Sequence, residues 1–146
     1  MSLEEKEAGD LAFRNGKLED ALAKYNLCLD KDGRFVSALS NRAAVHLALG
    51  RNESALQDCT RALELFESVG KAGVEGPRGP CPPRTSAKWK AWVAKTTIRR
   101  GTALHLLGGK ENILAAIADY ESAMRLDPGN EKLKHDLETL QAELDG

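Results

Sequence analysis

The strongest constraint in the sequence is a repeat with a period of 34 residues. The segment from Gly9 to Leu29 aligns with the segment from Ala43 to Leu63, and residues 101–130 form a third copy. Pairs of matching size in the first two copies are Gly9 and Ala43, Gly16 and Gly50, Ala21 and Ala55, and Cys28 and Ala62. A fixed period of this length indicates supersecondary units that bury their apolar faces by stacking on one another.

Each unit is predicted to be a pair of antiparallel helices, because apolar residues recur at helical spacing and strand signals are nearly absent. Two helices approach closely only where the residues at their crossing are small. Such residues recur on both helices of each unit: Gly9 with Ala21, Ala43 with Ala55, and Gly101 with Ala116. We expect Tyr25 and Tyr120 to fill the space toward the next helix, and Gly16 and Gly50 to form turns.

These three copies resemble the tetratricopeptide repeat family over nearly the whole chain. The resemblance implies an all-α fold, a right-handed α-solenoid of three helix pairs with a concave groove lined by the first helix of each pair. The last segment, EKLKHDLETLQAELD, carries leucines at helical spacing and is expected to form a capping helix. The expected units are residues 2–35, 36–69 and 94–130 for the helix pairs, and 131–146 for the capping helix.

A Pro- and Gly-rich insertion and the early start of the next helix, residues 70–93, separate the second and third copies. Four of the five prolines lie in it, so we expect an irregular, mobile loop. Ser86 is a candidate N-cap for a helix that begins early and runs to about Leu107. Trp89 and Trp92 then lie on an extension of that helix, where they either pack against the preceding helix or form a partner surface. The third copy also has three extra residues, which we expect between its helices, within GGKENI.

Some three-repeat members of the family bind the acidic C-terminal tail of heat-shock chaperones of the ninety- or seventy-kilodalton class. They hold its terminal carboxylates with a carboxylate clamp, Lys-x-x-x-Asn on the first helix, Asn on the third and Lys-x-x-x-Arg on the fifth. Lys6, Asn41, Lys95 and Arg99 match this pattern in type and register. A separation of four residues places Lys95 and Arg99 on one helix face, and the small residues that follow them leave room for a ligand.

The pattern departs from the family at Asp10, where the clamp has its first Asn. An ionised Asp donates no hydrogen bond and repels an incoming carboxylate. Asp10 therefore weakens chaperone binding, changes the preferred tail or abolishes this function. Two alternatives to tail binding stay open. The groove then binds another protein surface without reading a carboxylate, or Lys6 and Asp10 pair on a solvated face with little energetic effect.

Three segments, TIRRGTALHLL, DYESAMRLDPGN and LSNRAAVHLALG, are similar to a branch of the family that assists the assembly of axonemal dynein arms. This similarity implies a co-chaperone-like adaptor with client or assembly proteins as further partners. It also implies a β-sandwich domain upstream, so that the chain is expected to be one domain of a longer protein.

The overall charge is close to neutral, with 21 basic and 22 acidic residues, which argues against a general nucleic-acid binder. Residues 71–110, however, contain nine Lys or Arg and one acid, which gives either a local field for an acidic partner or a charged mobile loop. The three cysteines form no metal or disulfide pattern, and no apolar run is long enough for a membrane span, so we expect a cytoplasmic protein. Cys28 and Cys59 are expected to be buried.

No catalytic pattern is present in the sequence. The three histidines are isolated, and no phosphate-binding loop or nucleophile elbow occurs. We therefore expect neither an enzyme nor a cofactor or metal site. His46 and His105 lie beside the small groove positions, where they either pack between helices or contact a ligand.

Overall fold

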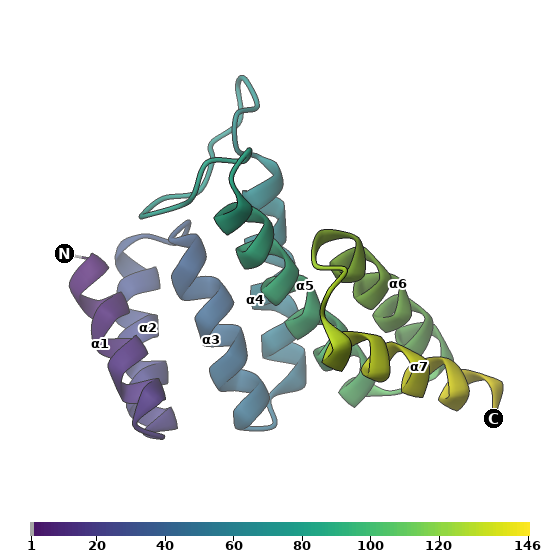
Figure 1. The fold of residues 1–146 in the computed structure, drawn as a ribbon. Helices are drawn as coiled ribbons and strands as arrows, with labels where there is room; N and C mark the ends of the chain where they lie inside the picture. The colour runs from purple at the N-terminus through teal and green to yellow at the C-terminus, as the bar shows by residue number, and fades with distance from the viewer. Residues whose placement is uncertain (1) are drawn as a thin grey trace.

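The computed structural model describes residues 2–146, which form seven α-helices (Figure 1). Their bounds are α1 (Ser2–Arg14), α2 (Leu18–Lys31), α3 (Val36–Ala48), α4 (Asn52–Glu67), α5 (Ala87–Leu107), α6 (Lys110–Leu126) and α7 (Glu131–Asp145). The helices follow one another across the molecule in chain order, so the two ends of the chain lie at opposite ends of the structure (Figure 1).

The helices pack as three antiparallel pairs and a seventh helix. Helix α1 packs on α2, α3 on α4 and α5 on α6, while α3 also touches α1 and α5. The first helices of the pairs are therefore neighbours along one side of the stack. This arrangement confirms the predicted α-solenoid, and we retain 2–35, 36–69 and 94–130 as the proposed limits of the pairs.

Small residues set the distance between the two helices of a pair, as predicted. A Cβ atom added at Gly9 would lie 2.6 Å from the Tyr25 ring, and one added at Gly101 would lie 2.6 Å from the Tyr120 ring. Each tyrosine thus packs back on the first helix of its own pair. The expectation that these rings reach toward the next helix holds for the Tyr25 hydroxyl, which interacts with Asn41 of α3. The close contact with the glycine of the tyrosine's own pair is an addition to it.

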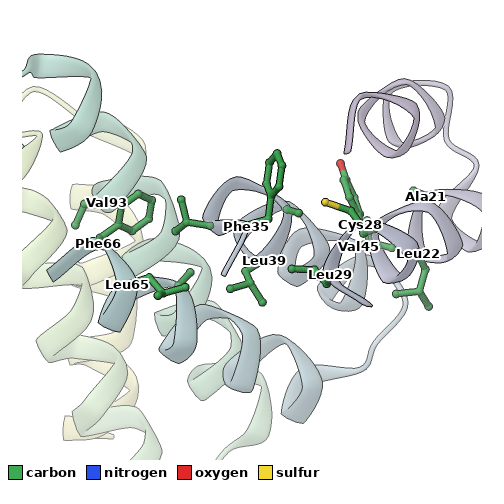
Figure 2. Packing of buried hydrophobic residues seen from close by; sticks show 14 of the residues in the cluster. Ala21, Leu22, Cys28, Leu29, Phe35, Leu39, Val45, Leu65, Phe66 and Val93 are labelled. Carbon is green, nitrogen blue, oxygen red and sulfur yellow. The ribbon is translucent and has the colours of Figure 1, made fainter. Parts of the chain in front are cut away.

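The largest cluster of buried apolar side chains runs from the first pair to the start of α5 (Figure 2). It includes Leu39 of α3, Leu65 and Phe66 of α4, and Val93 of α5. Cys28 is fully buried in the same cluster and Cys59 in a smaller one, as predicted. Because this cluster crosses the boundaries between pairs, it fixes α1, α3 and α5 relative to one another.

The turns explain where the sequence needs glycine. Gly16 and Gly50 adopt φ angles of 75° and 77°, which residues with a side chain rarely adopt, and this confirms their predicted role. In the third pair only Gly108 and Gly109 separate the helices, and α6 begins at Lys110. The extra residues of this copy extend the start of α6, so the prediction of a longer connection was wrong.

Helix α5 begins early, as predicted. The Ser86 hydroxyl accepts a hydrogen bond from the backbone N–H of Trp89 at 3.1 Å, which caps the helix. Trp89 is buried and meets Phe66 edge to face, with ring centroids 6.5 Å apart, so it packs against the preceding helix. Trp92, one turn further on, is half-buried and lines a hollow described below.

Helix α7 covers the last pair, as predicted for a capping helix. Asn130 caps it by accepting a hydrogen bond from the backbone N–H of Leu133 at 3.0 Å. Leu133 and Leu140 are buried against α6, and Leu137 and Leu144 pack beside them. The opposite face of α7 is polar, so the stack ends in a surface that water can solvate.

Candidate functional site

The predicted binding residues come together from three helices. Lys6 of α1, Asn41 of α3 and Lys95 of α5 line one hollow of about 140 Å³. Arg99 lies beside it and donates a hydrogen bond from Nη1 to Asn41 Oδ1 at 3.3 Å. The repeat brings these groups together, because α1 touches α3 and α3 touches α5 on the side where the first helices are neighbours.

The Asp10 carboxylate already contacts two other residues of the predicted site. Its carboxylate pairs with Lys6 Nζ at 2.7 Å and accepts a hydrogen bond from Asn41 Nδ2 at 3.0 Å. The Tyr25 hydroxyl also donates to it. Burial, reinforced by the Asp10 carboxylate, raises the pKa of the Tyr25 phenol, which therefore remains a donor at neutral pH. Asp10 thus neutralises the α1 side of the site from within the chain.

Arg99 carries a positive charge whose contacts are all with neutral groups. Its Nη1 donates to the Ser40 carbonyl at 2.9 Å and to Ser40 Oγ at 3.0 Å, in addition to Asn41. Burial lowers the pKa of the Arg99 guanidinium, which nevertheless stays charged at neutral pH. These bonds fix the orientation of Arg99 and leave its charge without an acidic partner among residues 2–146.

Lys95 is the second cation without an acidic partner. Its exposed ammonium makes no ion pair or hydrogen bond with any residue of the described part of the chain. It borders the 140 Å³ hollow on one side and a wider hollow of about 590 Å³ between α5 and the start of α7 on the other. The wider hollow is also lined by Lys90, Arg99 and Asp127. The α5 side of the site therefore offers positive charge to an anion.

Four further residues line the small hollow: Ser37, Ser40, Phe66 and Trp92. Of these, only Trp92 was considered from the sequence, as part of a candidate partner surface. Ser37 precedes Asn41 by four residues and Trp92 precedes Lys95 by three, so helical spacing places both near the predicted residues. That spacing was the available signal. Phe66 carried no such signal, since it comes from the end of α4.

The other candidate groups lie outside this hollow. His46 lies 3.6 Å from Asp58, and burial lowers the pKa of its imidazole. Asp58 also accepts two hydrogen bonds from the Arg42 guanidinium. His105 contacts Glu143 of α7 at 2.8 Å. Both histidines therefore pack between helices. Within residues 2–146, no cluster of acidic, His or Cys side chains has the arrangement of a metal site, and no helix has the length and apolarity of a membrane span.

The fold has close counterparts among solved structures. A first tetratricopeptide repeat domain of Spaghetti (RPAP3) bound to the HSP90 peptide SRMEEVD superposes with a TM-score of 0.75, 25% identity, and coverage of 99% of this chain and 96% of that one. The second such domain of human RPAP3, in complex with the HSP70 peptide SGPTIEEVD, has a TM-score of 0.71 and 27% identity, and covers 96% and 94% of the two chains. The chain is a tetratricopeptide repeat domain.

No model of a protein family matches the chain, but curated proteins are similar to it over nearly its whole length. Dynein axonemal assembly factor 4 of Rattus norvegicus is 30% identical over 141 residues, which are 97% of this chain and 29% of that protein. The Hsp70-Hsp90 organizing protein of Triticum aestivum is 30% identical over 145 residues, or 99% of this chain and 22% of that protein. The tetratricopeptide repeat domain described here thus spans less than a third of these relatives.

Proposed function

We propose that this domain is a non-enzymatic adaptor of the cytoplasm that binds the acidic C-terminal tail of a heat-shock chaperone. The observation that carries the proposal is the pair of cations on α5, Lys95 and Arg99, which have no acidic partner among residues 2–146. Lys95 lines one hollow with Lys6 and Asn41, and Arg99 lies beside this hollow and contacts Asn41. A chain ending in an acidic residue presents two carboxylates at one point, and such a group matches closely spaced cations.

Similar domains bound to HSP90 and HSP70 peptides support this assignment. The similarity to a dynein assembly factor further supports a role in assembling dynein arms or another complex. Each charge-assisted hydrogen bond contributes about 1.5–3 kcal/mol. Ordering of a flexible peptide opposes this gain, so we expect a dissociation constant in roughly the micromolar range.

Within this mechanism, Asp10 limits affinity. It holds Lys6 and the amide of Asn41, so these donors must be shared between Asp10 and the incoming tail. An Asp10→Asn substitution removes the negative charge and releases Lys6 from its ion pair. We expect Asp10→Asn to bind the tail about tenfold more tightly, which corresponds to about 1.4 kcal/mol.

Isothermal titration calorimetry with the peptide SRMEEVD, as the free acid and as the C-terminal amide, tests the proposal. We expect the free acid to bind and the amide to bind at least about tenfold more weakly. Lys95→Ala should weaken binding of the free acid, because it removes an unpaired cation. Lys24→Ala is the matched control, since Lys24 is exposed on α2, outside both hollows.

A scaffold that binds another protein surface without reading a carboxylate is the second candidate. The observation in its favour is the internal carboxylate of Asp10, which occupies half of the donor set. Equal affinity for the free acid and the amide, with no effect of Lys95→Ala, would favour this scaffold and contradict tail binding.

A further inference from the structure

The segment between α4 and α5, residues 68–86, folds back across the molecule and attaches to the turn between α2 and α3 (Figure 1). We call it the crossing segment. The backbone N–H of Arg78 donates a hydrogen bond to the Arg34 carbonyl at 2.7 Å, and the Arg78 guanidinium lies 3.5 Å from Asp32. Arg34 also pairs with Glu75. Two ion pairs and a backbone hydrogen bond therefore hold the middle of a segment that was expected to be mobile.

The crossing segment is attached at the start of α3, at the end of α4 and at the start of α5. Gly79 adopts a φ of 74°, and a Cβ atom added there would lie 2.7 Å from the ring of Phe35, which directly precedes α3. Arg84 donates hydrogen bonds to the carbonyls of Glu67 and Val69, at 3.2 and 3.3 Å. Two residues later, the segment ends in the serine that caps α5. It thus ties together the starts of two helices that carry binding residues.

These two helices, α3 and α5, meet at a chain of hydrogen bonds. The Thr96 hydroxyl donates to the Trp92 carbonyl at 2.9 Å and lies 2.6 Å from the Ser40 hydroxyl. Because a hydroxyl has a single proton, Ser40 donates to Thr96 and accepts from Arg99, whose Nη1 lies 3.0 Å from Ser40 Oγ. Arg99 also donates to Asn41 at 3.3 Å. The orientation of Arg99 therefore depends on how α3 is placed against α5.

The hydrogen bonds between α3 and α5 lie close to the points where the crossing segment is attached. At 1.5 Å per residue, Asn41 lies about 9 Å along α3 from Phe35. Lys95 lies about 14 Å along α5 from Ser86. Helices curve only gently over such distances, so a constraint at the start of each helix also fixes the side chains two turns further on.

We propose that the crossing segment is a brace that positions α3 against α5, and with them the binding side chains of Asn41, Lys95 and Arg99. The segment lines neither hollow of the site, so it acts on binding only through the helices. A braced site is assembled before a peptide binds, which lowers the ordering cost of binding. The inference rests on the proposed function for its ligand, an acidic peptide with a free C-terminus, but the position of Arg99 is measurable without a ligand.

Gly79→Ala tests the brace, because the added methyl group meets the Phe35 ring and displaces the segment. Gly73→Ala is the matched control, since Gly73 has the same φ of 74° and nothing within 4 Å of an added Cβ. Amide hydrogen exchange shows whether the segment has detached. We expect the Arg78 N–H to be protected in the unaltered chain and in Gly73→Ala, and to exchange at least about tenfold faster in Gly79→Ala.

Two measurements then follow the site itself. In a proton–nitrogen NMR spectrum without peptide, the Nε–H signal of Arg99 should shift in Gly79→Ala and stay in place in Gly73→Ala. By isothermal titration calorimetry, Gly79→Ala should bind the free acid SRMEEVD about threefold more weakly, because fewer molecules hold the site assembled. Gly73→Ala should bind it within about 1.5-fold of the unaltered chain.

A second variant removes the brace without placing a methyl group on Phe35. Replacement of residues 75–80 by Gly-Ser-Gly-Ser-Gly-Ser keeps the length of the segment and Gly79, but it removes both ion pairs and two prolines. It should shift the Arg99 signal and weaken binding at least as much as Gly79→Ala. Lys71→Ser, at an exposed position of the same segment, is its control and should change neither.

The outcomes distinguish the brace from tail binding. If the replaced or detached segment left the Arg99 signal and the affinity for SRMEEVD unchanged, the brace would be contradicted and tail binding would stand. If no chain bound SRMEEVD, tail binding would be overturned, and the Arg99 signal would still decide whether the segment positions this residue. Circular dichroism should show that all variants remain helical.

Discussion

The first and third helix pairs use the same packing device but differ in the residue beside it. In each pair a glycine on the first helix receives a tyrosine ring from the second, Tyr25 on Gly9 and Tyr120 on Gly101. In each pair the tyrosine hydroxyl forms a hydrogen bond with the residue that follows the glycine. This residue is Asp10, a carboxylate, in the first pair and Thr102, a hydroxyl at 2.9 Å, in the third. The repeat thus fixes geometry, while single residues decide the charge.

The two pairs also differ at the residues that precede the glycine and the tyrosine in the sequence. In the third pair, Arg100 forms two hydrogen bonds to Asp119, at 2.8 and 2.9 Å, and Asp119 is buried. The equivalent positions of the first pair are Ala8 and the exposed Lys24. The third pair is therefore held together by an ion pair, whereas the first relies on apolar packing and the contacts of Asp10.

The largest effect should come from breaking this ion pair. Arg100→Ala leaves the Asp119 carboxylate buried without its partner, so we expect the free energy of unfolding to fall by about 3 kcal/mol. Urea denaturation followed by circular dichroism measures it. Lys24→Ala, at the position equivalent to Asp119, should change the free energy by less than about 0.5 kcal/mol. Similar losses in both variants would contradict the assigned difference between the pairs.

A smaller effect should separate the two tyrosine hydroxyls. Tyr25→Phe removes a hydrogen bond to a carboxylate and should cost about 2 kcal/mol, whereas Tyr120→Phe removes a bond between neutral hydroxyls and should cost about 1 kcal/mol. The same denaturation experiment compares them, and the ring packing is unchanged in both. If Tyr120→Phe were the more destabilising, the charge of Asp10 would not be what distinguishes the pairs.

The smallest loss of stability is expected from changing the glycine on which the tyrosine ring packs in each pair. Gly9→Ala and Gly101→Ala each place a methyl group 2.6 Å from a tyrosine ring carbon. Overpacking costs about 1–3 kcal/mol, and the better helix propensity of Ala returns up to about 1 kcal/mol, so each variant should lose about 1 kcal/mol. Gly129→Ala, with nothing within 4 Å of the added Cβ, serves as the control. An increase in stability in either variant would show that the ring moves aside freely.

The sequence was sufficient to predict most of the fold. The period of 34 residues and the small residues at Gly9 and Gly101 predicted the helix pairs, because a close crossing has few chemical solutions. The contact of the Tyr25 ring with Gly9 of its own pair was not predicted, since periodicity gives the face of a helix but not every neighbour that receives a side chain. Ser86 predicted the early start of α5 through its local capping chemistry.

The site was predicted in part. The match to the family's clamp pattern in residue type and register indicated that Lys6, Asn41 and Lys95 lie together, and they line one hollow. Their role in binding a peptide stays a prediction. The contacts of Asp10 with Asn41 and Tyr25 depend on distances between helices, which spacing along the chain does not give. The attachment of residues 68–86 to the α2–α3 turn was missed, because Pro- and Gly-rich composition indicates irregular backbone but not what the backbone touches.

The burial of two cysteines has a practical consequence for chemical labelling. Burial raises the pKa of the Cys28 thiol to about 11 and that of the Cys59 thiol to about 12, and the reactive species is the thiolate. Cys81 is half-exposed and lines the same hollow as Trp92. A maleimide dye should therefore attach first at Cys81, beside an indole that quenches fluorophores, and so report optically on movement of the segment behind the binding groove.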